Sequence, residues 1–348
     1  MGKTILGVMS GTSLDGLDIA VCTFHKKNSL FEFQVIAKQS IRFSPALYKS
    51  LSKCRKSDGL SLSKLDVELG HFIGQSVKDF VSEKKLKVDY IASHGHTVFH
   101  QPEIGLTKQI GNGAEIYAIT GIPTINDFRT VDVALKGQGA PLVPIGDQLL
   151  FPDYDYCLNL GGIANVSYDY KGERQAFDIS ACNILLNYLS NEKGLEYDKG
   201  GKLGKSGKLN KKLFDQLNAF EYFSNQGPKT LGIEWIEENQ ISLINNSILS
   251  LEDKLCSVYH HIAYQIAQST NSEKVLITGG GAHNTFLIEL IERYSDKLFP
   301  KAPKDLIDFK EAIIFAFLGY LRITLTNNCL SSVTGATSDN IGGAIYGA

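Results

Sequence analysis

The sequence lacks several features that would place it in a specialised protein class. It has no run of about 18 apolar residues, so we expect no membrane-spanning helix. Its 35 Lys and Arg nearly balance 37 Asp and Glu, and a net charge of −2 argues against a nucleic-acid or anionic-membrane partner. The apolar run at residues 4–9 is too short for a signal peptide. We therefore expect a soluble, cytoplasmic protein.

Metal-binding and common catalytic motifs are also missing. No two of the six cysteines have CxxC spacing, and no Cys/His pattern is typical of zinc, so we expect buried thiols in a reducing compartment. The phosphate-binding GxxxxGK[ST], the dinucleotide-binding GxGxxG and the hydrolase GxSxG patterns are all absent. The 348 residues, 43% of them hydrophobic, are enough for two folded domains.

Two strand–turn–strand patterns organise the chain. Strands are predicted at residues 4–9 and 17–24 around a glycine turn, and again at 156–160 and 166–170 around another. Buried strands at 88–92 and 274–278 alternate with predicted helices, at residues 63–83, 248–269, 283–294 and 310–326. This alternation favours an α/β fold with two similar halves.

Three glycine turns follow apolar strands, at residues 11–16 (GTSLDG), 161–165 (GGIAN) and 279–284 (GGGAHN). Such a turn has two interpretations. It is either a tight turn that needs a positive φ, or a backbone cradle whose N–H groups approach a phosphate. Because ligands collect beyond strand ends in α/β sheets, three such turns together favour a nucleotide site.

The segment 7–18 (GVMSGTSLDGLD) closely resembles the opening motif of the anhydro-N-acetylmuramic acid kinases, which belong to the superfamily of actin, Hsp70 and hexokinase. Further blocks resemble the family in the expected order over essentially the whole chain: 93–97 (SHGHT), 109–112 (QIGN), 126–129 (NDFR), 137–144 (GQGAPLVP), 159–165 (NLGGIAN), 176–178 (AFD), 197–199 (YDK), 227–230 (GPKT), 278–284 (TGGGAHN), 310–312 (KEA) and 333–336 (VTGA). The first motif and the GQGAP block are the specific ones.

The resemblance implies a fold and a reaction. The fold is α/β, with two ribonuclease-H-like domains around a nucleotide cleft: residues 1–127 with 311–348, and residues 128–310. The reaction is ATP-dependent phosphorylation of O6 of 1,6-anhydro-N-acetylmuramic acid, with water opening the anhydro bridge to give N-acetylmuramic acid 6-phosphate. It needs a general base, ATP and Mg²⁺. The resemblance also implies cell-wall recycling, a small-molecule sugar substrate and a homodimer.

Asp178 matches the catalytic aspartate of the family and is the expected general base. From the residues alone, an Asp between the apolar strand 175–177 and a helix start at 179–183 could equally be a helix N-cap.

The other site residues follow from the same resemblance. The expected nucleotide-binding residues are Gly11, Thr12, Ser13, Asp15, Gly16, Gly161, Gly162, Asn165, Gly279, Gly280, Gly281 and Asn284, with Asp15 also organising Mg²⁺. The expected residues for the sugar and its lactyl carboxylate are His94, Arg129, Gln138 and Glu311. Structural alternatives exist for three of them: a turn residue for Asp15, a helix-dipole role for Glu311 and an ordinary hydrogen-bonded histidine for His94.

The chain departs from the family beside Asp178. Family members commonly have DTGPGN, whereas residues 178–183 here read DISACN, so side chains stand where backbone could approach a ligand. This leaves open a kinase of the same fold for another anhydro or amino sugar, or a nucleotide- or sugar-binding sensor without catalysis. The lysine-rich residues 199–212 are expected to form a solvated loop or an exposed helix start.

Overall fold

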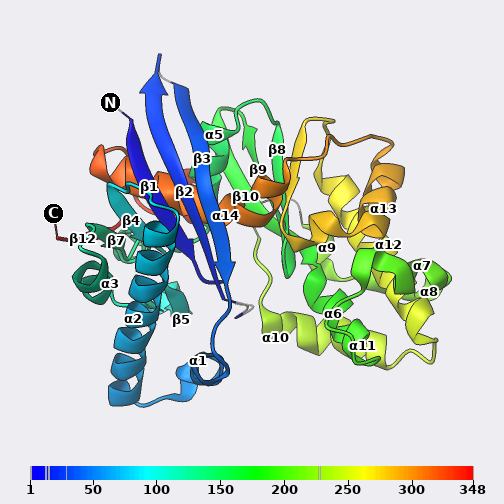
Figure 1. Cartoon of the computed structure of the whole chain (residues 1–348). Helices are drawn as coiled ribbons and strands as arrows, with labels where there is room; N and C mark the ends of the chain where they lie inside the picture. Colours follow the sequence, from blue (N-terminus) through cyan, green and yellow to red (C-terminus); the bar gives the residue numbers. More distant parts are fainter. Residues whose placement is uncertain are drawn as a thin grey trace. The chain divides into compact units, whose positions relative to one another are not determined.

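The structure is a computed structural model, and it describes residues 2–11, 14, 16–28, 30–225, 227 and 229–347. The chain divides into two compact units. The first unit comprises residues 1–152 and 309–348, and the second comprises residues 153–308. Figure 1 shows the helices and strands of each unit.

The compact units differ in extent from the two domains expected from the sequence. Residues 128–152 belong to the first unit, because α5 (Val143–Leu150) packs against β3 (Leu30–Ile41) and the ring of Phe151 lies edge-on to that of Phe33, 5.8 Å between centroids. The second boundary, between residues 308 and 309, falls inside α14 (Lys304–Ile323).

A six-stranded sheet forms the centre of the first unit, in the order β12-β7-β4-β1-β2-β3. Strands β1, β2 and β3 are antiparallel neighbours, while β4 and β7 continue the sheet parallel to β1. The strands other than β3 are β1 (Lys3–Met9), β2 (Leu17–Lys27), β4 (Tyr90–Ser93), β7 (Thr124–Asn126) and β12 (Ala344–Tyr346). Three antiparallel strands followed by parallel ones are the strand arrangement of a ribonuclease-H-like domain.

Helices cover both faces of this sheet (Figure 1). Because successive side chains of a strand point to opposite faces, Leu6 and Val8 of β1 join the core under α2 (Gly59–Glu83). Gly7, between them, faces α14, where a Cβ would lie only 1.9 Å from the carbonyl oxygen of Ala312. Glycine at position 7 therefore lets β1 and α14 pack in direct contact.

The second unit repeats the same strand order with a four-stranded sheet, β10-β9-β8-β11. Strands β8 (Tyr156–Leu160), β9 (Ile163–Tyr170) and β10 (Glu173–Ala181) are antiparallel neighbours, and β11 (Val275–Thr278) runs parallel to β8. The long helix α12 (Leu251–Ser269) packs against β10, and against the helices α6 (Asn183–Asn191) and α13 (Thr285–Ser295). The predicted α/β class with two ribonuclease-H-like units is thereby confirmed.

Shorter elements complete both units. In the first unit they are α1 (Pro45–Leu51), η1 (Cys54–Lys56), β5 (His96–Gln101), η2 (Pro102–Ile104), β6 (Leu106–Ile110), α3 (Gly113–Thr120), α4 (Thr130–Ala134) and α15 (Ser331–Thr334). In the second they are η3 (Lys199–Gly201), α7 (Lys202–Ser206), α8 (Lys211–Asn218), α9 (Glu221–Ser224), α10 (Ile233–Trp235), the π-helix η4 (Ile236–Ile241), α11 (Ser242–Asn245) and η5 (Gly280–His283).

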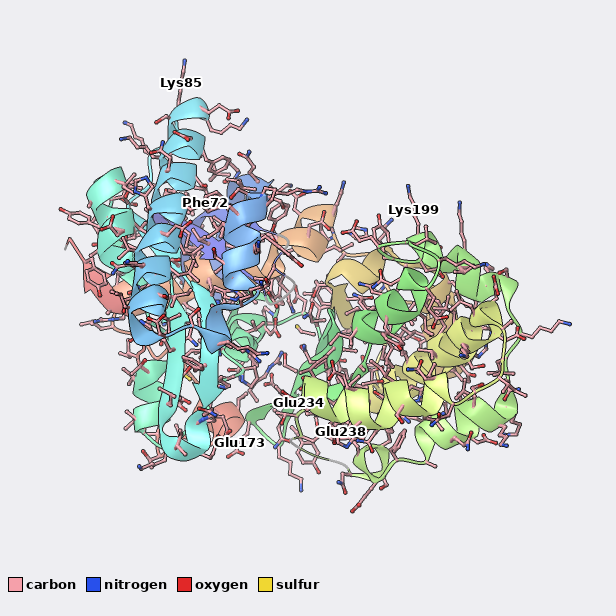
Figure 2. The ribbon with its side chains drawn as sticks, turned by 90° about the horizontal axis from the view of Figure 1, so that it is seen from below. Phe72, Lys85, Glu173, Lys199, Glu234 and Glu238 are labelled. Carbon is pink, nitrogen blue, oxygen red and sulfur yellow. The ribbon has the colours of Figure 1, made fainter. Side chains whose placement is uncertain are left out.

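Of the two structures expected for the lysine-rich segment, the structure shows the exposed helix start: Lys202 and Lys211 are the first residues of α7 and α8. Five of its six lysines lie on η3, α7 and α8, and Lys208 lies between α7 and α8. Lys199 is exposed at the edge of the second unit (Figure 2). Its glycines are packed instead: a Cβ at Gly204 would lie 2.3 Å from the ring of Tyr259. The segment is therefore part of the fold, and only the solvated-loop alternative is wrong.

All six cysteines are buried and free, as predicted. Among the described residues, no helix combines the length and apolar character needed to cross a membrane.

Candidate active site

Asp178 lies in the middle of β10, where the pairing with β9 has an irregularity between Asp178 and Ser180. Its Oδ2 accepts a hydrogen bond from the N–H of Leu231 at 3.0 Å, and its own N–H donates to the carbonyl of Lys229 at 2.9 Å. Helix α6 begins only at Asn183, with Cys182 as its N-cap residue and no capping side chain. The N-cap alternative for Asp178 is therefore wrong.

The surroundings of Asp178 favour its neutral form. Burial raises the pKa of its carboxyl group, and the N–H of Leu231 opposes this only in part. Lys229, whose carbonyl accepts from the N–H of Asp178, uses its ammonium elsewhere: it donates to the carbonyls of Tyr222 and Asn225 and lies 4.4 Å from the centre of the Tyr222 ring. Oδ1 of Asp178 accepts no hydrogen bond from a described residue, so it is available to accept a proton.

A polar row crosses the sheet of the second unit beside Asp178. Asn165 is its direct cross-strand partner, and Asn159 is in turn the partner of Asn165. Directly opposite residues share one face of a sheet with Cβ atoms about 5 Å apart. Asn165 was expected in the site from the resemblance, whereas Asn159 was not. Its signal in the sequence is its position, two residues before the glycine pair 161–162, while Asn165 lies three residues after that pair.

The divergent segment after Asp178 points into the core. Ile179, Ser180, Ala181 and Cys182 are at most 1% exposed, and all but the serine belong to the hydrophobic core of the second unit. Their side chains therefore do not occupy a position where a ligand could contact the backbone. Asn183, which the segment retains, donates to the carbonyl of Leu160 at 3.0 Å and ties α6 to the end of β8.

The second glycine turn joins β8 to β9. The carbonyls of Gly161 and Gly162 accept hydrogen bonds from the N–H groups at the start of α6, which fixes the turn on that helix. Neither glycine has a positive φ, and a Cβ would meet its nearest neighbour at 3.4 Å for Gly161 and 3.2 Å for Gly162. The fold itself gives little reason for glycine here, which favours the interpretation that a ligand approaches the backbone.

In the third glycine turn, at residues 279–284, the fold itself requires glycine at two positions. Gly279 has φ +83°, and a Cβ there would lie 2.4 Å from Oδ1 of Asn159. A Cβ at Gly281 would lie 2.7 Å from Cβ of Leu160, whereas a Cβ at Gly280 would meet only one atom, at 3.8 Å. The tight-turn interpretation therefore explains Gly279 and Gly281, and only Gly280 has room for a ligand.

Both ends of the Asn284 amide make hydrogen bonds within the protein. Its Oδ1 caps α13 by accepting from the N–H of Leu287, and its Nδ2 donates to the hydroxyl of Tyr259 at 2.7 Å. The hydroxyl of Tyr259 in turn donates to Asp198, whose carboxylate also accepts the N–H groups of Leu203 and Gly204. The structure therefore shows Asn284 as an anchor of the glycine turn.

The first glycine turn is only partly visible. Thr12, Ser13 and Asp15, expected to bind phosphate and Mg²⁺, lie outside the described residues. The carbonyl of Gly11 accepts a hydrogen bond from Leu14 at 3.3 Å. Gly16 has φ +145°, and a Cβ there would lie 2.1 Å from the carbonyl oxygen of Ile41, so the fold requires glycine at that position.

His94 and Arg129 are brought together in the first unit. Nε2 of His94 accepts from Nε and Nη2 of Arg129 at 3.2 and 2.9 Å, and its Nδ1 donates to the carbonyl of Gly95. Burial and the neighbouring guanidinium hold the pKa of His94 well below its usual value, so the ring is neutral. Burial also lowers the pKa of Arg129, to about 10, which leaves it charged at neutral pH. His94 is thus a hydrogen-bonded histidine that orients Arg129.

Glu311 lies close enough to Arg129 for each to shift the pKa of the other. Burial raises the pKa of its carboxyl group, and Lys310 and Arg129 oppose the rise. Glu311 is the eighth residue of α14, beyond the first turn where a helix dipole acts, so the helix-dipole alternative is wrong. Gln138 lies on the loop that Arg129 contacts through Gly139, but its side chain is exposed.

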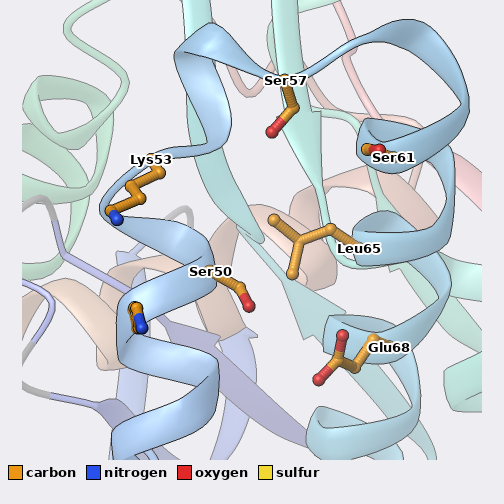
Figure 3. A pocket seen from close by; sticks show the side chains of 7 residues that line it. Ser50, Lys53, Ser57, Ser61, Leu65 and Glu68 are labelled. Carbon is orange, nitrogen blue, oxygen red and sulfur yellow. The ribbon is translucent and has the colours of Figure 1, made fainter.

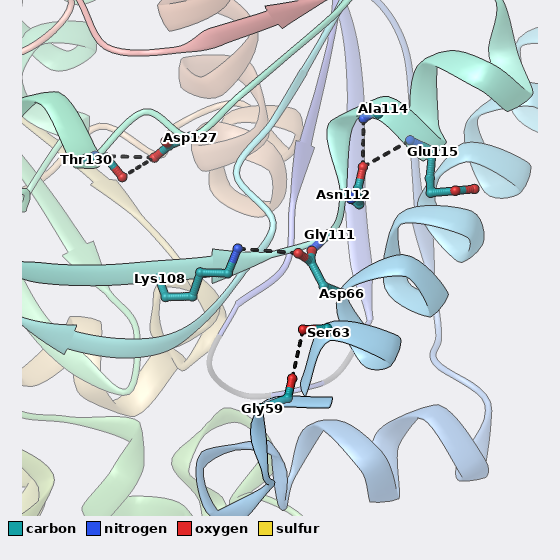
Figure 4. Close-up of polar contacts among 10 residues, drawn as sticks. All are labelled: Gly59, Ser63, Asp66, Lys108, Gly111, Asn112, Ala114, Glu115, Asp127 and Thr130. Carbon is teal, nitrogen blue, oxygen red and sulfur yellow. Dashed lines mark hydrogen bonds and ion pairs between the residues drawn. The ribbon is translucent and has the colours of Figure 1, made fainter. Parts of the chain in front are cut away.

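A polar pocket of about 150 Å³ opens beside His94. Residues from several of the family-like blocks line it: His94, Gly95, Gln109, Ile110, Gly111, Asn112, Asn126 and Asp127. Figure 4 shows how its wall is held: Asp66 of α2 accepts from the N–H of Gly111 at 2.7 Å and from Lys108, and Asn112 caps α3. Parts of three blocks, at residues 93–97, 109–112 and 126–129, thus meet in one hollow, and the block at 109–112 had no individual role in the sequence analysis.

A second cavity, of about 320 Å³, lies between α1 and α2 (Figure 3). Its lining is mostly exposed and consists of Lys49, Ser50, Lys53, Ser57, Ser61, Leu65 and Glu68. None of the expected site residues is among them.

Two ribonuclease-H-like units with glycine turns at their strand ends define the class of the actin and hexokinase superfamily. The family model for anhydro-N-acetylmuramic acid kinase matches residues 3–348, so the chain belongs to that family. Relatives that carry this name include those of Sulfurimonas denitrificans, 31% identical over 99% of this chain and 100% of the relative, and Actinobacillus pleuropneumoniae, 35% identical over 98% of each. Among solved structures, (R)-2-hydroxyglutaryl-CoA dehydratase component A of Acidaminococcus fermentans matches with a TM-score of 0.47 at 13% identity, over 90% of this chain and 96% of that one.

Proposed function

We propose that the protein phosphorylates O6 of 1,6-anhydro-N-acetylmuramic acid with ATP while water opens the anhydro bridge, giving N-acetylmuramic acid 6-phosphate. Family membership over residues 3–348 supports the reaction. The observation that carries the proposal is the carboxyl group of Asp178, half-buried with a raised pKa and with one oxygen free of hydrogen bonds from described residues.

In this proposal Asp178 is the general base. Its Oδ1 takes a proton from the water whose oxygen forms a bond to C1 of the sugar. The bond from C1 to the bridging oxygen breaks, and that oxygen, as O6, receives the γ-phosphoryl group while ADP leaves. A raised pKa suits the task, because a base whose pKa lies closer to the working pH removes a proton more effectively. The N–H of Leu231 on Oδ2 fixes the carboxylate plane.

The first unit binds the sugar through Arg129 and Glu311. The guanidinium of Arg129, oriented by His94, receives the lactyl carboxylate, since a charged fork matches a carboxylate. The carboxyl group of Glu311 lies beside it and suits a sugar hydroxyl. We assign the neighbouring 150 Å³ pocket to the hydroxyl and amide groups of the sugar, because its lining is rich in polar side chains that can bind them. Gln138 stays a proposed sugar residue of the same loop.

The glycine turns fit a triphosphate and a nucleoside. Among the described glycines of the second and third turns, Gly161, Gly162 and Gly280 are those at which a Cβ would meet no atom closer than 3.2 Å. We assign the first two to phosphate and the third to adenosine. Gly279, Gly281 and Asn284 shape the adenosine turn, and Asn165 lies between the phosphate turn and Asp178. Gly11 and Gly16, with Thr12, Ser13 and Asp15 outside the described residues, complete the proposed phosphate site.

ATP supplies the phosphoryl group, and Mg²⁺ supplies charge that offsets the triphosphate. Among the described residues, no three His, Cys, Asp or Glu side chains are grouped to hold a metal ion. Mg²⁺ usually keeps several waters and is bound through one or two carboxylates together with substrate phosphates. Asp15 stays our proposed water-mediated partner for it.

The divergent segment 179–182 gives little support to another sugar, because its side chains are buried in the core. We propose anhydro-N-acetylmuramic acid as the substrate on family membership. The proposals of a homodimer, a cytoplasmic location and a role in peptidoglycan recycling depend on the resemblance alone.

The test is ATP turnover by the purified protein with Mg²⁺, with and without 1,6-anhydro-N-acetylmuramic acid, with the sugar product weighed by mass spectrometry. We expect a product heavier by one phosphoryl group and one water. A product without the added water would mean conventional phosphorylation and would remove the role of Asp178. ATP binding without turnover on this sugar would overturn the substrate assignment.

A further inference from the structure

Asp132 is a buried carboxylate that no step above uses. It lies in α4 and is 0% exposed. Its Oδ1 accepts hydrogen bonds from the side chains of Cys329, Thr334 and Asn340 at 3.0, 2.8 and 2.8 Å. Its Oδ2 accepts from the N–H of Gly139 at 2.7 Å. A buried carboxylate is costly unless it is paired or hydrogen-bonded, and here four donors compensate the charge.

The loop of residues 137–139 is closed tightly around this carboxylate. The N–H of Gly137 donates to the main-chain carbonyl of Asp132 at 2.9 Å, and a Cβ at Gly137 would lie only 2.2 Å from its Oδ2. Gly139 has φ +67°, and a Cβ there would lie 2.7 Å from Val133. Both glycines of the family-like GQG sequence are therefore required for the loop to wrap around Asp132.

Gly139 connects Asp132 to Arg129. Its N–H is held by Asp132, and its carbonyl accepts from Nη1 of Arg129 at 2.6 Å. The other two hydrogen bonds of the guanidinium to described residues, from Nε and Nη2, go to His94. Of the five N–H groups of a guanidinium, two then have no partner among the described residues, one on each terminal nitrogen. A carboxylate that binds end-on uses one N–H from each terminal nitrogen.

We propose that Asp132 is a positioning residue that fixes Gly139, so that Arg129 presents its two free N–H groups to the carboxylate of the sugar. This rests on the proposed function, in which Arg129 binds that carboxylate. His94 holds one side of the guanidinium and Gly139 holds the other. Asp132 acts on the substrate only through this second contact.

The test is steady-state kinetics of Asp132→Asn. An amide has only one acceptor oxygen where the carboxylate has two. Either the N–H of Gly139, or the three side chains that donate to Oδ1, therefore loses its acceptor. We expect the KM for the sugar to rise by about 10-fold or more, as for the loss of a buried charge-assisted hydrogen bond, with the KM for ATP within about twofold of wild type. Cys329→Ser keeps a donor to Oδ1 and is the matched control, with an unchanged KM for the sugar.

A double-mutant cycle separates positioning from general stabilisation. In an Arg129→Lys background, Asp132→Asn is expected to change the KM for the sugar by less than about twofold, because the guanidinium it positions is gone. The full effect in that background, or equal rises in both KM values, would overturn the proposal. If Asp132→Asn does not fold, Thr334→Val removes one donor to Oδ1 and is expected to give a smaller rise that also disappears with Arg129→Lys.

A spectroscopic readout keeps this proposal separate from the proposed function. The Nε–H resonance of Arg129, assigned by its loss in Arg129→Lys, is expected to shift or broaden in Asp132→Asn and to stay in place in Cys329→Ser. An unchanged resonance in Asp132→Asn would overturn the positioning role even if the enzyme turns over the sugar. A shifted resonance in a protein that does not use this sugar would overturn only the proposed substrate.

Discussion

Asn165 lies directly opposite Asp178 in the neighbouring antiparallel strand, four residues after the start of the glycine turn at Gly161. Since opposite residues share one face of a sheet, the amide and the carboxylate are neighbours about 5 Å apart at their Cβ atoms. The pairing of β8, β9 and β10 thus brings the proposed general base and the proposed phosphate turn to the same part of the second unit. Their positions relative to each other are fixed by strand register, which loop motion does not change.

Replacing Asp178 by Asn should remove the base and keep the fold. Asn retains an acceptor for the N–H of Leu231, so the local hydrogen bond survives. We expect kcat to fall by about 10²- to 10⁴-fold, the usual contribution of a general base, with ATP affinity unchanged. Coupled-enzyme kinetics and calorimetric titration with ATP measure the two quantities.

Cys182→Ala is a matched control for Asp178→Asn, because Cys182 lies in the divergent segment but its side chain is fully buried. It should keep kcat. If Asp178→Asn keeps more than about one tenth of the wild-type kcat, a different group must accept the proton of the water.

The raised pKa of Asp178 has consequences for stability as well as rate. The folded protein favours the protonated carboxyl group, so Asp178 makes the fold less stable as pH rises from the ordinary pKa of an aspartate to its raised value. Above this window the loss is complete. We expect Asp178→Asn to unfold at a higher temperature than wild type at neutral pH, and the difference to shrink on acidification. Calorimetry of both proteins at two pH values checks the sign.

The catalytic rate should change over the same pH range as the stability, but it should rise with pH where the stability falls. Because the base must be ionised, kcat should fall on the acidic side, with a midpoint above the pKa of an ordinary aspartate. A midpoint at or below that ordinary value would contradict the assigned burial of Asp178.

The sequence predicted the local elements better than the long-range contacts. Both hairpins were predicted because glycine turns separate apolar runs that are typical of strands, and β1, β2, β8 and β9 confirm them. Strands β3 and β7 were missed. Residues 30–41 mix polar and apolar side chains at an exposed sheet edge, and β7 has only three residues. Helix α14 begins six residues before its predicted start, because charged residues at 304–308 interrupt the apolar pattern.

In the candidate site too, the sequence predicted local positions better than long-range contacts. The position of Asp178 followed from a motif, but its partner Leu231 lies 53 residues away and no local pattern indicates it. Asp132 was missed altogether, since its partners Cys329 and Asn340 are 197 and 208 positions distant. Contacts of this kind depend on how β-strands and helices assemble, which motif spacing does not contain.

His261 should make the protein sensitive to acid. It is 0% exposed, and its ring donates from Nδ1 to Asn218 and accepts at Nε2 from Gln240. Burial lowers its pKa from the ordinary 6.5 to about 3. The unfolded chain therefore binds a proton that the folded one does not, and stability is lost as pH falls below the ordinary value, by up to about 1.4 kcal/mol per pH unit.

The measurement is the free energy of unfolding in urea at pH 7.5 and at pH 5. We expect His261→Gln to be less stable at pH 7.5 but to lose less stability on acidification than wild type. Equal losses in the two proteins would show that the ring of His261 does not resist protonation.

The glycine turns offer a direct test of which glycines serve a ligand and which serve the fold. Alanine at Gly161 would meet its nearest neighbour at an ordinary 3.4 Å, with no positive φ to oppose it. We expect Gly161→Ala to unfold within about 1 kcal/mol of wild type, as for a substitution that the native backbone accommodates. Its KM for ATP should nevertheless rise by about 10-fold or more, because the added methyl group stands where a phosphate approaches the backbone.

Gly279→Ala is the comparison variant, for which we expect the reverse balance of effects on stability and ATP binding. Its φ of +83° and the 2.4 Å approach to Asn159 make alanine there strained, so we expect a clear loss of thermal stability. The two variants differ by the same methyl group, and each is measured by calorimetry and by ATP titration. A Gly161→Ala protein that is stable and binds ATP as well as wild type would leave the β8–β9 turn without a nucleotide role. The phosphates would then have to be held by the residues around Gly11 alone.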